Sequence, residues 1–332
     1  MMHSLGARAQ STTRTRTPGE IVAAATPTSQ VGRRIVDRAF LGVCIAFTAL
    51  AVLLLVILLA SIWQDGHARL SWQFLSSFAS RKTEEAGVRA PLWGSIWVCV
   101  ICAVAALPIG VGTAIYLEEF SKRSRFRSFI QLNIANLAGV PSIVYGILGL
   151  TAFARAFGTA NSEDPITFGQ PESFFYLQLP FGHGVLAGGL TLMLVVLPIV
   201  IVSSQEALRT VPGSLRTAAL ALGATQWQTT WNITLPASIP MIMTGGILTM
   251  SRAIGEAAPI LVLGVPLFIR STPINLMSDF TVLPLQIYNW SMRQQSGFHE
   301  LAAAGIIVLL AVLLTLNALA VIIRHRLQRA NG

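Results

Sequence analysis

Long apolar stretches alternate with short polar ones along most of the 332-residue chain. A helix rises about 1.5 Å per residue, so crossing an apolar bilayer core of about 30 Å takes roughly 20 apolar residues. Six stretches meet this length: residues 39–62, 93–117, 129–158, 183–204, 240–269 and 301–323. The pattern therefore predicts an all-α integral membrane protein with six transmembrane helices.

Residues that interrupt a regular helix lie inside four of these stretches, and most of them are prolines. They are Pro108, Asn133, Asn136, Pro141, Pro198 and Pro259. Membrane helices tolerate proline where neighbouring helices or a cavity satisfy the freed backbone groups. Several interrupted helices in one chain favour a pathway between helices over a plain membrane anchor.

Composition agrees with a surface that faces lipid. The chain is 53% hydrophobic and 11% charged, whereas soluble domains carry about 25% charged residues. The net charge of +9 does not indicate nucleic acid, because only two of the 23 basic residues are lysines and the arginines lie in short runs between apolar stretches. We expect no nucleic-acid partner.

The basic residues also predict the orientation of the chain. Fifteen of them lie in the N-terminal tail, the loops 118–128 and 205–239, and the C-terminus, against seven in the alternate loops. Both termini are therefore expected to be cytoplasmic, with residues 325–332 as the C-terminal tail. Residues 1–38 are rich in Ser, Thr, Arg and Pro and are expected to be a disordered basic tail, although their low acid content is also typical of an organellar transit peptide.

The sequence offers no catalytic or metal-binding arrangement. Cys99 and Cys102 form a C-x2-C pair without a second Cys or His pair, so these thiols and Cys44 are interpreted as small core residues. The two lysines, Lys82 and Lys122, follow Arg and Ser, so no G-x4-G-K-[ST] motif exists and the chain cannot bind ATP by a P-loop. We expect a non-enzymatic subunit with no cofactor, whose energy comes from another chain.

The stretch EALRTVPGSLRTAALALGATQWQTTWNITLPASI, residues 206–239, is too apolar for a flexible linker. Ser214 is expected to cap a first short helix that ends at Gly223, and Thr225 to cap a second that carries Trp227 and Trp231. The apolar faces of this helix pair could be buried in the groove of a partner protein or against the lipid surface. The pattern alone leaves both open.

This stretch resembles the E-A-A-x3-G-x9-I-x-L-P signature of ABC importer permeases. The matching residues are Ala218, Ala219, Gly223, Ile233, Leu235 and Pro236. The resemblance implies that the loop docks on an ATP-binding subunit and carries its motion into the membrane. Thr217 stands where the family usually has glutamate, so we expect coupling to depend instead on a neighbour such as Arg216.

Four further fragments, in consistent order, are similar to the PstA-type permeases of phosphate ABC transporters. They are LEEF (117–120), NLAGVPSIVYGILGL (136–150), SRAIGEAAPIL (251–261) and LPLQIYNW (283–290). The resemblance implies a type I ABC importer permease (MetI-like) fold over residues 91–324, behind a first transmembrane helix at 39–62. It also implies a bacterial inner-membrane complex with a second homologous permease, two ATP-binding subunits and an extracytoplasmic phosphate-binding protein.

Two charges lie inside the fifth apolar stretch. Arg252 is 12 residues beyond Pro240, or about 18 Å along an ideal helix, and Glu256 is expected one turn later on the same face. A charge near mid-membrane is by default a functional site, although a structural i,i+4 ion pair would also explain it. A guanidinium fits phosphate oxygens in two-point contact, and a carboxylate could accept a hydrogen bond from a P–OH group.

Polar groups of the third stretch are further candidates for the substrate pathway, although interhelical hydrogen bonds would also explain them. These are Asn136, Ser142 and Tyr145. Outside the third stretch, Trp93, Tyr288 and Trp290 suit an aromatic belt.

The residues leave two alternatives to phosphate import. Another oxyanion such as sulfate or molybdate would suit Arg252 equally well. An ATP-independent anion channel or secondary transporter could also use mid-membrane charges, but it leaves the 206–239 loop unexplained and predicts an inverted-repeat symmetry that the apolar stretches do not show.

Overall fold

The computed structural model describes residues 28–122, 124–155, 166–170, 173 and 176–330. The chain divides into two units, Met1–Ala60 and Ser61–Gly332. Helix α2, Thr28–Gly66, is all that is described of the first unit, and its last residues belong to the second. Because α2 begins at Thr28, residues 28–38 are helical, and the expectation of a disordered tail over 1–38 is wrong for this part. Residues 1–27 lie outside the described residues.

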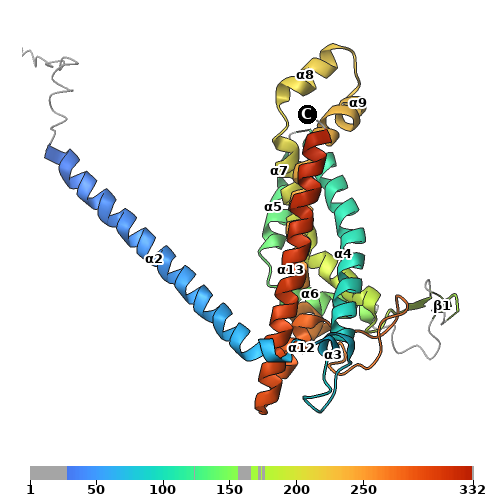
Figure 1. The fold of residues 1–332 in the computed structure, drawn as a ribbon. Coiled ribbons are helices and arrows are strands. Elements are labelled where there is room, and N and C mark those ends of the chain that lie inside the picture. The colour runs from blue at the N-terminus through green and yellow to red at the C-terminus, as the bar shows by residue number, and fades with distance from the viewer. Residues whose placement is uncertain (1–27, 123, 156–165, 171–172, 174–175, 331–332) are drawn as a thin grey trace, which may run out of the picture. The chain divides into compact units, whose positions relative to one another are not determined.

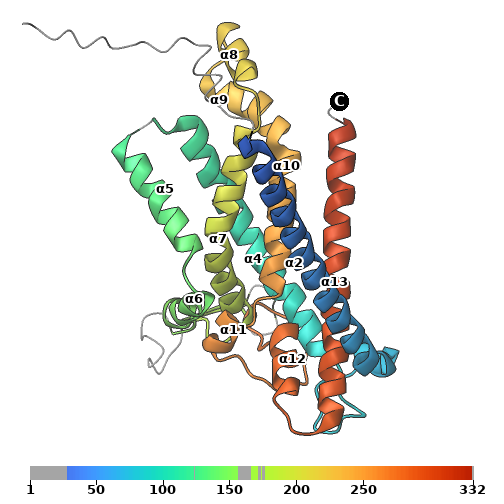
Figure 2. The same cartoon turned by 90° about the vertical axis from the view of Figure 1, so that its left-hand side faces the viewer.

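The second unit is built almost entirely of helices, and its long helices lie side by side (Figures 1 and 2). The helices are α3 (Trp72–Ser76), α4 (Arg89–Ile115), α5 (Arg125–Ala138), α6 (Ser142–Gly149), α7 (Val185–Arg209), α8 (Gly213–Ala221), α9 (Gln226–Thr229), α10 (Leu235–Ile254), α11 (Ala258–Leu263), α12 (Leu283–Ser291) and α13 (Ser296–Ala330). Short 3-10 and π-helical segments join or extend them: η1 (His67–Arg69), η2 (Tyr116–Phe120), η3 (Leu150–Ala154) and η5 (Thr230–Thr234). A short antiparallel pair, β1 (Ile166–Phe168) and β2 (Leu177–Leu179), is an addition that the sequence pattern did not predict.

Five helical segments of the described chain are long and apolar enough to cross a membrane. They are Val36–Arg69, Arg89–Phe120, Val185–Arg209, Gln226–Ile254 and Ser296–Leu319. A sixth span is obtained if the bent pair Arg125–Ala138 and Ser142–Ala154 is counted as one. The predicted all-α membrane architecture with six spans is therefore confirmed, with one span sharply bent.

The third predicted span, 129–158, is not one straight helix. Its two halves, α5 and α6, meet at 99°, and Pro141 lies directly before α6 with an extended ψ of 134°. Proline has no N–H to continue the helix and fits the first turn of a new one. The hydroxyl of Tyr145 donates a 2.8 Å hydrogen bond to the carbonyl of Leu137, which satisfies one backbone group at the end of α5.

The fifth predicted span, 240–269, is also divided. Helix α10 ends at Ile254 with Gly255 as its C-cap, and α11 begins at Ala258 with Pro259 in its first turn. Pro259 therefore starts a new short helix and does not kink a continuous one. Glycine at 264, with φ +81°, ends α11 in a left-handed conformation that favours this residue.

Helix α7 is the centre of the packing, because it contacts α4, α5, α6, α10 and α11. The contact between α4 and α7 is close. A Cβ atom added at Gly110 of α4 would lie 2.6 Å from Cγ1 of Val200 on α7, so only glycine fits there without movement. Small residues of this kind let membrane helices approach closely enough for extensive van der Waals contact.

A second apolar cluster lies among α3, α12 and α13. Trp290 is only 1% exposed in it, and its ring lies 6.1 Å from that of Phe74. The expectation that Trp290 belongs to an aromatic belt is therefore wrong, whereas Trp93 and Tyr288 are exposed.

The two ends of the second unit differ. Helices α8 and α9 and the C-terminal end of α13 lie at one end, and α11 and α12 lie at the opposite end (Figures 1 and 2). The loop 206–239 and the C-terminus thus share the end for which the arginine distribution predicts a cytoplasmic location.

Candidate functional site

The loop between α7 and α10 forms two short helices joined by a glycine turn. Helix α8 ends in a Schellman motif, in which Ala224 N–H binds the Ala219 carbonyl and Gly223 N–H binds the Leu220 carbonyl. Gly223 has φ +86°, as its predicted role as a helix stop requires. The predicted cap at Ser214 is wrong, because α8 begins at Gly213 after Pro212.

The second loop helix begins with a capping box. The hydroxyl of Thr225 accepts a hydrogen bond from Gln228 N–H, and the side chain of Gln228 binds Thr225 N–H in return. The predicted cap at Thr225 is therefore confirmed, and the signal for it was the T-x-x-Q pattern.

Helix α9 is not separate from α10. It continues through the π-helical turn η5 into α10, so that Gln226–Ile254 is one helical segment (Figure 2). Ile233, Leu235 and Pro236 lie half-buried along it. At about 1.5 Å per residue, this segment is roughly 43 Å long, and Arg252 lies in its last turn. Helix α9 and Arg252 thus belong to one helical segment.

The outer surface of α8 is apolar and exposed. Leu215 and Leu220 are 46% and 49% exposed, and Leu222 is 90% exposed. Thr217 and Ala218 are also exposed, whereas Ala219 is buried against the rest of the loop. The two alanines of the signature thus have different surroundings, one facing outward and one inward.

Glu119, at the end of the second span, holds α8 through its carboxylate and α9 through its backbone carbonyl. Glu119, in η2, accepts a hydrogen bond at 2.9 Å from Nη2 of Arg216 on α8, and its backbone carbonyl accepts one from the side-chain amide of Gln226 on α9. Arg216 also donates to the carbonyls of Leu208 and Val211. Its guanidinium is engaged inside the chain, and the expected role of Arg216 in coupling stays a prediction.

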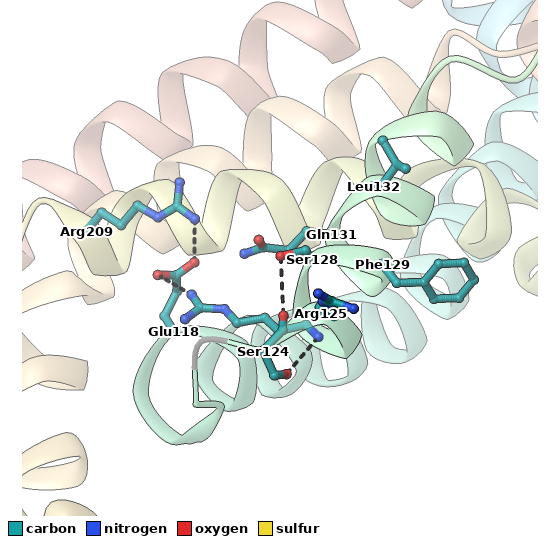
Figure 3. Close-up of a pocket in the computed structure, with 9 residues that line it drawn as sticks. Glu118, Ser124, Arg125, Ser128, Phe129, Gln131, Leu132 and Arg209 are labelled. Atoms are coloured by element: carbon teal, nitrogen blue, oxygen red, sulfur yellow. Dashed lines mark hydrogen bonds and ion pairs between the residues drawn. The ribbon is translucent and has the colours of Figure 1, made fainter.

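The neighbouring carboxylate, Glu118, joins two other elements. It lies 2.6 Å from Nη2 of Arg209 at the end of α7 and 3.4 Å from Nη2 of Arg127 in the first turn of α5 (Figure 3). Glu118 and Glu119 side chains are 12% and 8% exposed. Carboxylates this poorly hydrated are stable only beside their arginine partners, so the ion pairs fix the positions of η2, α5, α7 and α8 relative to one another.

An aromatic cluster strengthens the same junction. The ring of Phe120 in η2 lies 5.8 Å from that of Trp227 on α9, which in turn lies 5.3 Å from that of Trp231. Both tryptophans keep an exposed face, at 60% and 45%. Contacts of this geometry add to the hydrophobic burial between the two elements.

Sequence reasoning did not identify this junction. Glu118 and Glu119 served only as part of a resembling fragment, and Arg127 and Arg209 only as orientation charges. The available signal was a pair of acids directly after an apolar span, at the same end of the chain as two arginine-bearing loops. It does not say which acid meets which arginine, because that depends on the packing of η2, α5, α7 and α8.

The predicted pair Arg252 and Glu256 is present but loose. Nε of Arg252 lies 3.7 Å from Oε1 of Glu256, and the two side chains are 67% and 21% exposed. The expectation that both lie on one helical face is wrong, because α10 ends at Ile254 and Glu256 follows the helix. Because Arg252 is exposed and its contact with Glu256 is long, its guanidinium keeps N–H donors free to bind an anion.

The pathway candidates of the third span lie on α5 and α6. Asn136 is exposed near the end of α5, Ser142 opens α6, and Tyr145 is buried with its hydroxyl bound to Leu137. Helix α6 packs on α11, which begins shortly after Glu256. In the described part of the chain, no hydrogen bond or ion pair joins these three residues to the pair itself. Their roles in a pathway stay predictions, and the bond of Tyr145 favours a structural role.

Comparison with known proteins identifies the family. The family model described as binding-protein-dependent transport system inner membrane component matches residues 106–329. A probable ABC transporter permease protein YqgI of Bacillus subtilis is 28% identical over 286 residues, with 83% of this chain and 90% of that protein covered. The phosphate transport system permease protein PstA 1 of Mycobacterium tuberculosis is 33% identical, with coverages of 72% and 70%. The phosphate transport system permease protein PstC of Xylella fastidiosa is 29% identical, with coverages of 89% and 91%.

Solved structures show the same fold at low identity. A chain of the bacterial alginate ABC transporter, crystallised with an alginate pentasaccharide-bound periplasmic protein, superposes with a TM-score of 0.57 at 16% identity over 88% of this chain and 94% of that one. A chain of the inward-facing MetNI methionine ABC transporter gives a TM-score of 0.52 at 13% identity over 71% and 93%. The chain therefore belongs to the family of binding-protein-dependent transport system inner membrane components, and it is a permease subunit of an ABC importer.

Proposed function

We propose that this permease imports inorganic phosphate and that the α8–α9 loop couples it to an ATP-binding subunit. The observation that carries the proposal is the continuity of α9 with α10, which joins an exposed apolar docking surface at one end to Arg252 at the other. The cargo is supported by relatives named as phosphate transport system permeases. Both PstA and PstC proteins are among the relatives, which supports a second permease that is homologous to this chain.

The complex would contain this chain, that second permease, two ATP-binding subunits and a phosphate-binding protein outside the cell. In a bacterial inner membrane, both termini and the α8–α9 loop would face the cytoplasm, as the arginine distribution predicts. The exposed leucines at 215, 220 and 222 would then enter a groove on an ATP-binding subunit.

The mechanism would be alternating access. Closure of the ATP-binding subunits moves α8 and α9, and the helical segment Gln226–Ile254 passes this movement to the region of Arg252. Glu119 keeps α8 and α9 moving as one body with the end of α4, because both helices are bonded to it. Hydrolysis of ATP then resets the inward-facing state.

Arg252 would supply the anion contact. Its guanidinium is 67% exposed and offers a fork of donors that suits two oxygens of phosphate. Glu256 is close enough to orient Arg252 and could accept the P–OH hydrogen of a protonated phosphate, which fully ionised sulfate lacks. A site with such an acceptor disfavours an analogue without the donor.

The test is uptake of labelled phosphate in phosphate-starved cells at matched membrane levels of each variant. We expect Arg252→Met to lose uptake, while Arg270→Met, a matched change at another exposed arginine, keeps it. Excess sulfate should not compete with phosphate. Normal uptake by Arg252→Met would remove Arg252 from the pathway, and full competition by sulfate would assign a different oxyanion as the cargo.

A further inference from the structure

A basic cavity of about 960 Å³ lies at the end of the molecule that carries α8 and α9. It is lined by residues of η2, α7 and the N-terminal half of α5 (Figure 3). These are Glu118, Ser124, Arg125, Arg127, Ser128, Phe129, Gln131, Leu132 and Arg209. The transport path proposed above does not use this cavity. The cavity lies near the α8–α9 end of the molecule, whereas Arg252 lies in the last turn of α10, at the far end of the segment that begins with α9.

The charges around the cavity are unbalanced. Three arginines face one carboxylate, and Glu118 is already shared between Arg127 and Arg209. Arg125 is exposed, and its side chain has neither a hydrogen bond nor an ion pair to any other described residue. The lining therefore carries an excess of two positive charges, with Arg125 free to bind an anion.

Polar groups without charge lie between the arginines. Ser124 accepts a hydrogen bond from Arg127 N–H, and Ser128 donates to the carbonyl of Ser124, so the first turn of α5 is well fixed. Gln131 points into the space between α5 and α7, on the side of Arg209 (Figure 3). An anion held by Arg125 would thus have further donors within a rigid frame.

The outer side of α5 next to the cavity is strongly apolar. Phe126, Phe129 and Leu132 are 70%, 62% and 60% exposed, and they run along the helix away from its basic first turn. Figure 3 shows Phe129 pointing away from the space between α5 and α7. A ligand that fits both features has an anionic head and an apolar chain.

We propose that this cavity binds the phosphodiester headgroup of an anionic phospholipid, with Arg125 as the main contact and the acyl chains along Phe126, Phe129 and Leu132. The bilayer surface is where such a headgroup occurs, and basic pockets between transmembrane helices on the cytoplasmic side recognise anionic lipids. Inorganic phosphate shares the headgroup chemistry but has no use for the apolar surface. The proposal is independent of the cargo assigned above.

A lipid bound in this cavity would also affect the ion pairs of Glu118 with Arg127 and Arg209. A headgroup in the cavity lies beside Glu118, whose pairs with Arg209 and Arg127 join α7 to α5. Its negative charge offsets the excess of arginines there, so a bound lipid would stabilise this junction.

The experiment uses the full-length chain, purified with the subunits that accompany it and stripped of lipid with detergent. Native mass spectrometry then measures binding of phosphatidylglycerol, phosphatidylethanolamine and inorganic phosphate. Arg125→Gln is the test variant, and Arg324→Gln is the matched control, because Arg324 is an exposed arginine in the C-terminal part of α13. Elution at the same size checks that each variant is folded.

We expect retained phosphatidylglycerol on the wild type and on Arg324→Gln, and about fivefold weaker binding on Arg125→Gln, as the loss of one basic contact near a membrane surface predicts. Phosphatidylethanolamine should bind weakly to all three. Equal binding of both lipids, or no effect of Arg125→Gln, would overturn the proposal. Displacement of phosphatidylglycerol by millimolar inorganic phosphate would also overturn it and assign the cavity to the free ion.

Discussion

The anchoring of α8 by Glu119 gives the sharpest prediction about stability. Glu119→Gln removes the charge that faces Arg216 across 2.9 Å, while the side chain keeps its size. Arg216 is 26% exposed, and its Nε already lacks a hydrogen-bond partner. Removing one partner of a fully buried pair costs about 3–5 kcal/mol. Because Arg216 is partly hydrated, we expect a smaller cost of about 2 kcal/mol for local opening of the loop.

Hydrogen–deuterium exchange on the full chain in lipid nanodiscs measures this opening directly. A cost of about 2 kcal/mol corresponds to roughly thirtyfold faster exchange of the amides of α8. The amides of α7 and α4 should change little. Uptake should fall as well, because α8 no longer moves as one body with the end of the second span.

The matched control is a second carboxylate–arginine pair. Glu300 lies 2.8 Å from Nε of Arg69, but its side chain is 44% exposed. Exposed pairs contribute about 0–1 kcal/mol, so Glu300→Gln should leave exchange near its own position and in α8 almost unchanged. Equal, small effects of Glu119→Gln and Glu300→Gln would refute the claim that burial makes the Glu119 pair a structural anchor.

Three further predictions concern single residues. Gly223→Ala places a side chain at φ +86° with no atom nearby to clash, so we expect a purely conformational cost of about 1 kcal/mol, measured as faster exchange of α8 and contradicted by unchanged exchange. Gly110→Ala should lower the thermal unfolding temperature in detergent, because the new Cβ meets Val200, by an overpacking cost of about 1–3 kcal/mol. Gly112→Ala, on the same helix with open space around it, should leave the unfolding temperature unchanged. Equal shifts for the two variants would refute the claim that α4 and α7 are in close contact at Gly110. Leu222→Glu changes a 90% exposed side chain, so the chain should stay as stable as the wild type while co-purification of the ATP-binding subunits falls at least tenfold; unchanged co-purification would exclude Leu222 from the docking surface.

Much of the fold could be predicted from the sequence, because apolar length alone identifies membrane spans. The limits of that reasoning appear at Pro141 and Pro259. Both were recognised as interruptions, but a proline can kink a helix or start a new one, and the choice depends on packing. Here α6 packs closely on α11, since a Cβ added at Gly146 would lie 2.8 Å from the carbonyl oxygen of Pro259. Pro141 directly precedes α6 and Pro259 lies in the first turn of α11, so each proline begins one of the two contacting helices.

In the loop, the turn at Gly223 and the cap at Thr225 could be predicted, whereas the cap at Ser214 was wrong and the contacts with the rest of the chain were not identified. Gly223 and Thr225 act through their own backbone and nearest neighbours, so local sequence was enough. The anchoring of Arg216 by Glu119 joins residues 97 positions apart, and no local pattern encodes it. The burial of Trp290 has the same origin, since it depends on Phe74 from a distant part of the chain.

The central claim is that this permease uses ATP to move phosphate, and reconstitution tests it most directly. The full complex is placed in proteoliposomes, and labelled phosphate accumulation is measured with ATP, without ATP, and with a tenfold excess of sulfate. The account predicts accumulation only with ATP, with little loss to sulfate. Accumulation that proceeds equally without ATP would contradict it, because the α8–α9 loop and its continuous helix to Arg252 would then have no driven role.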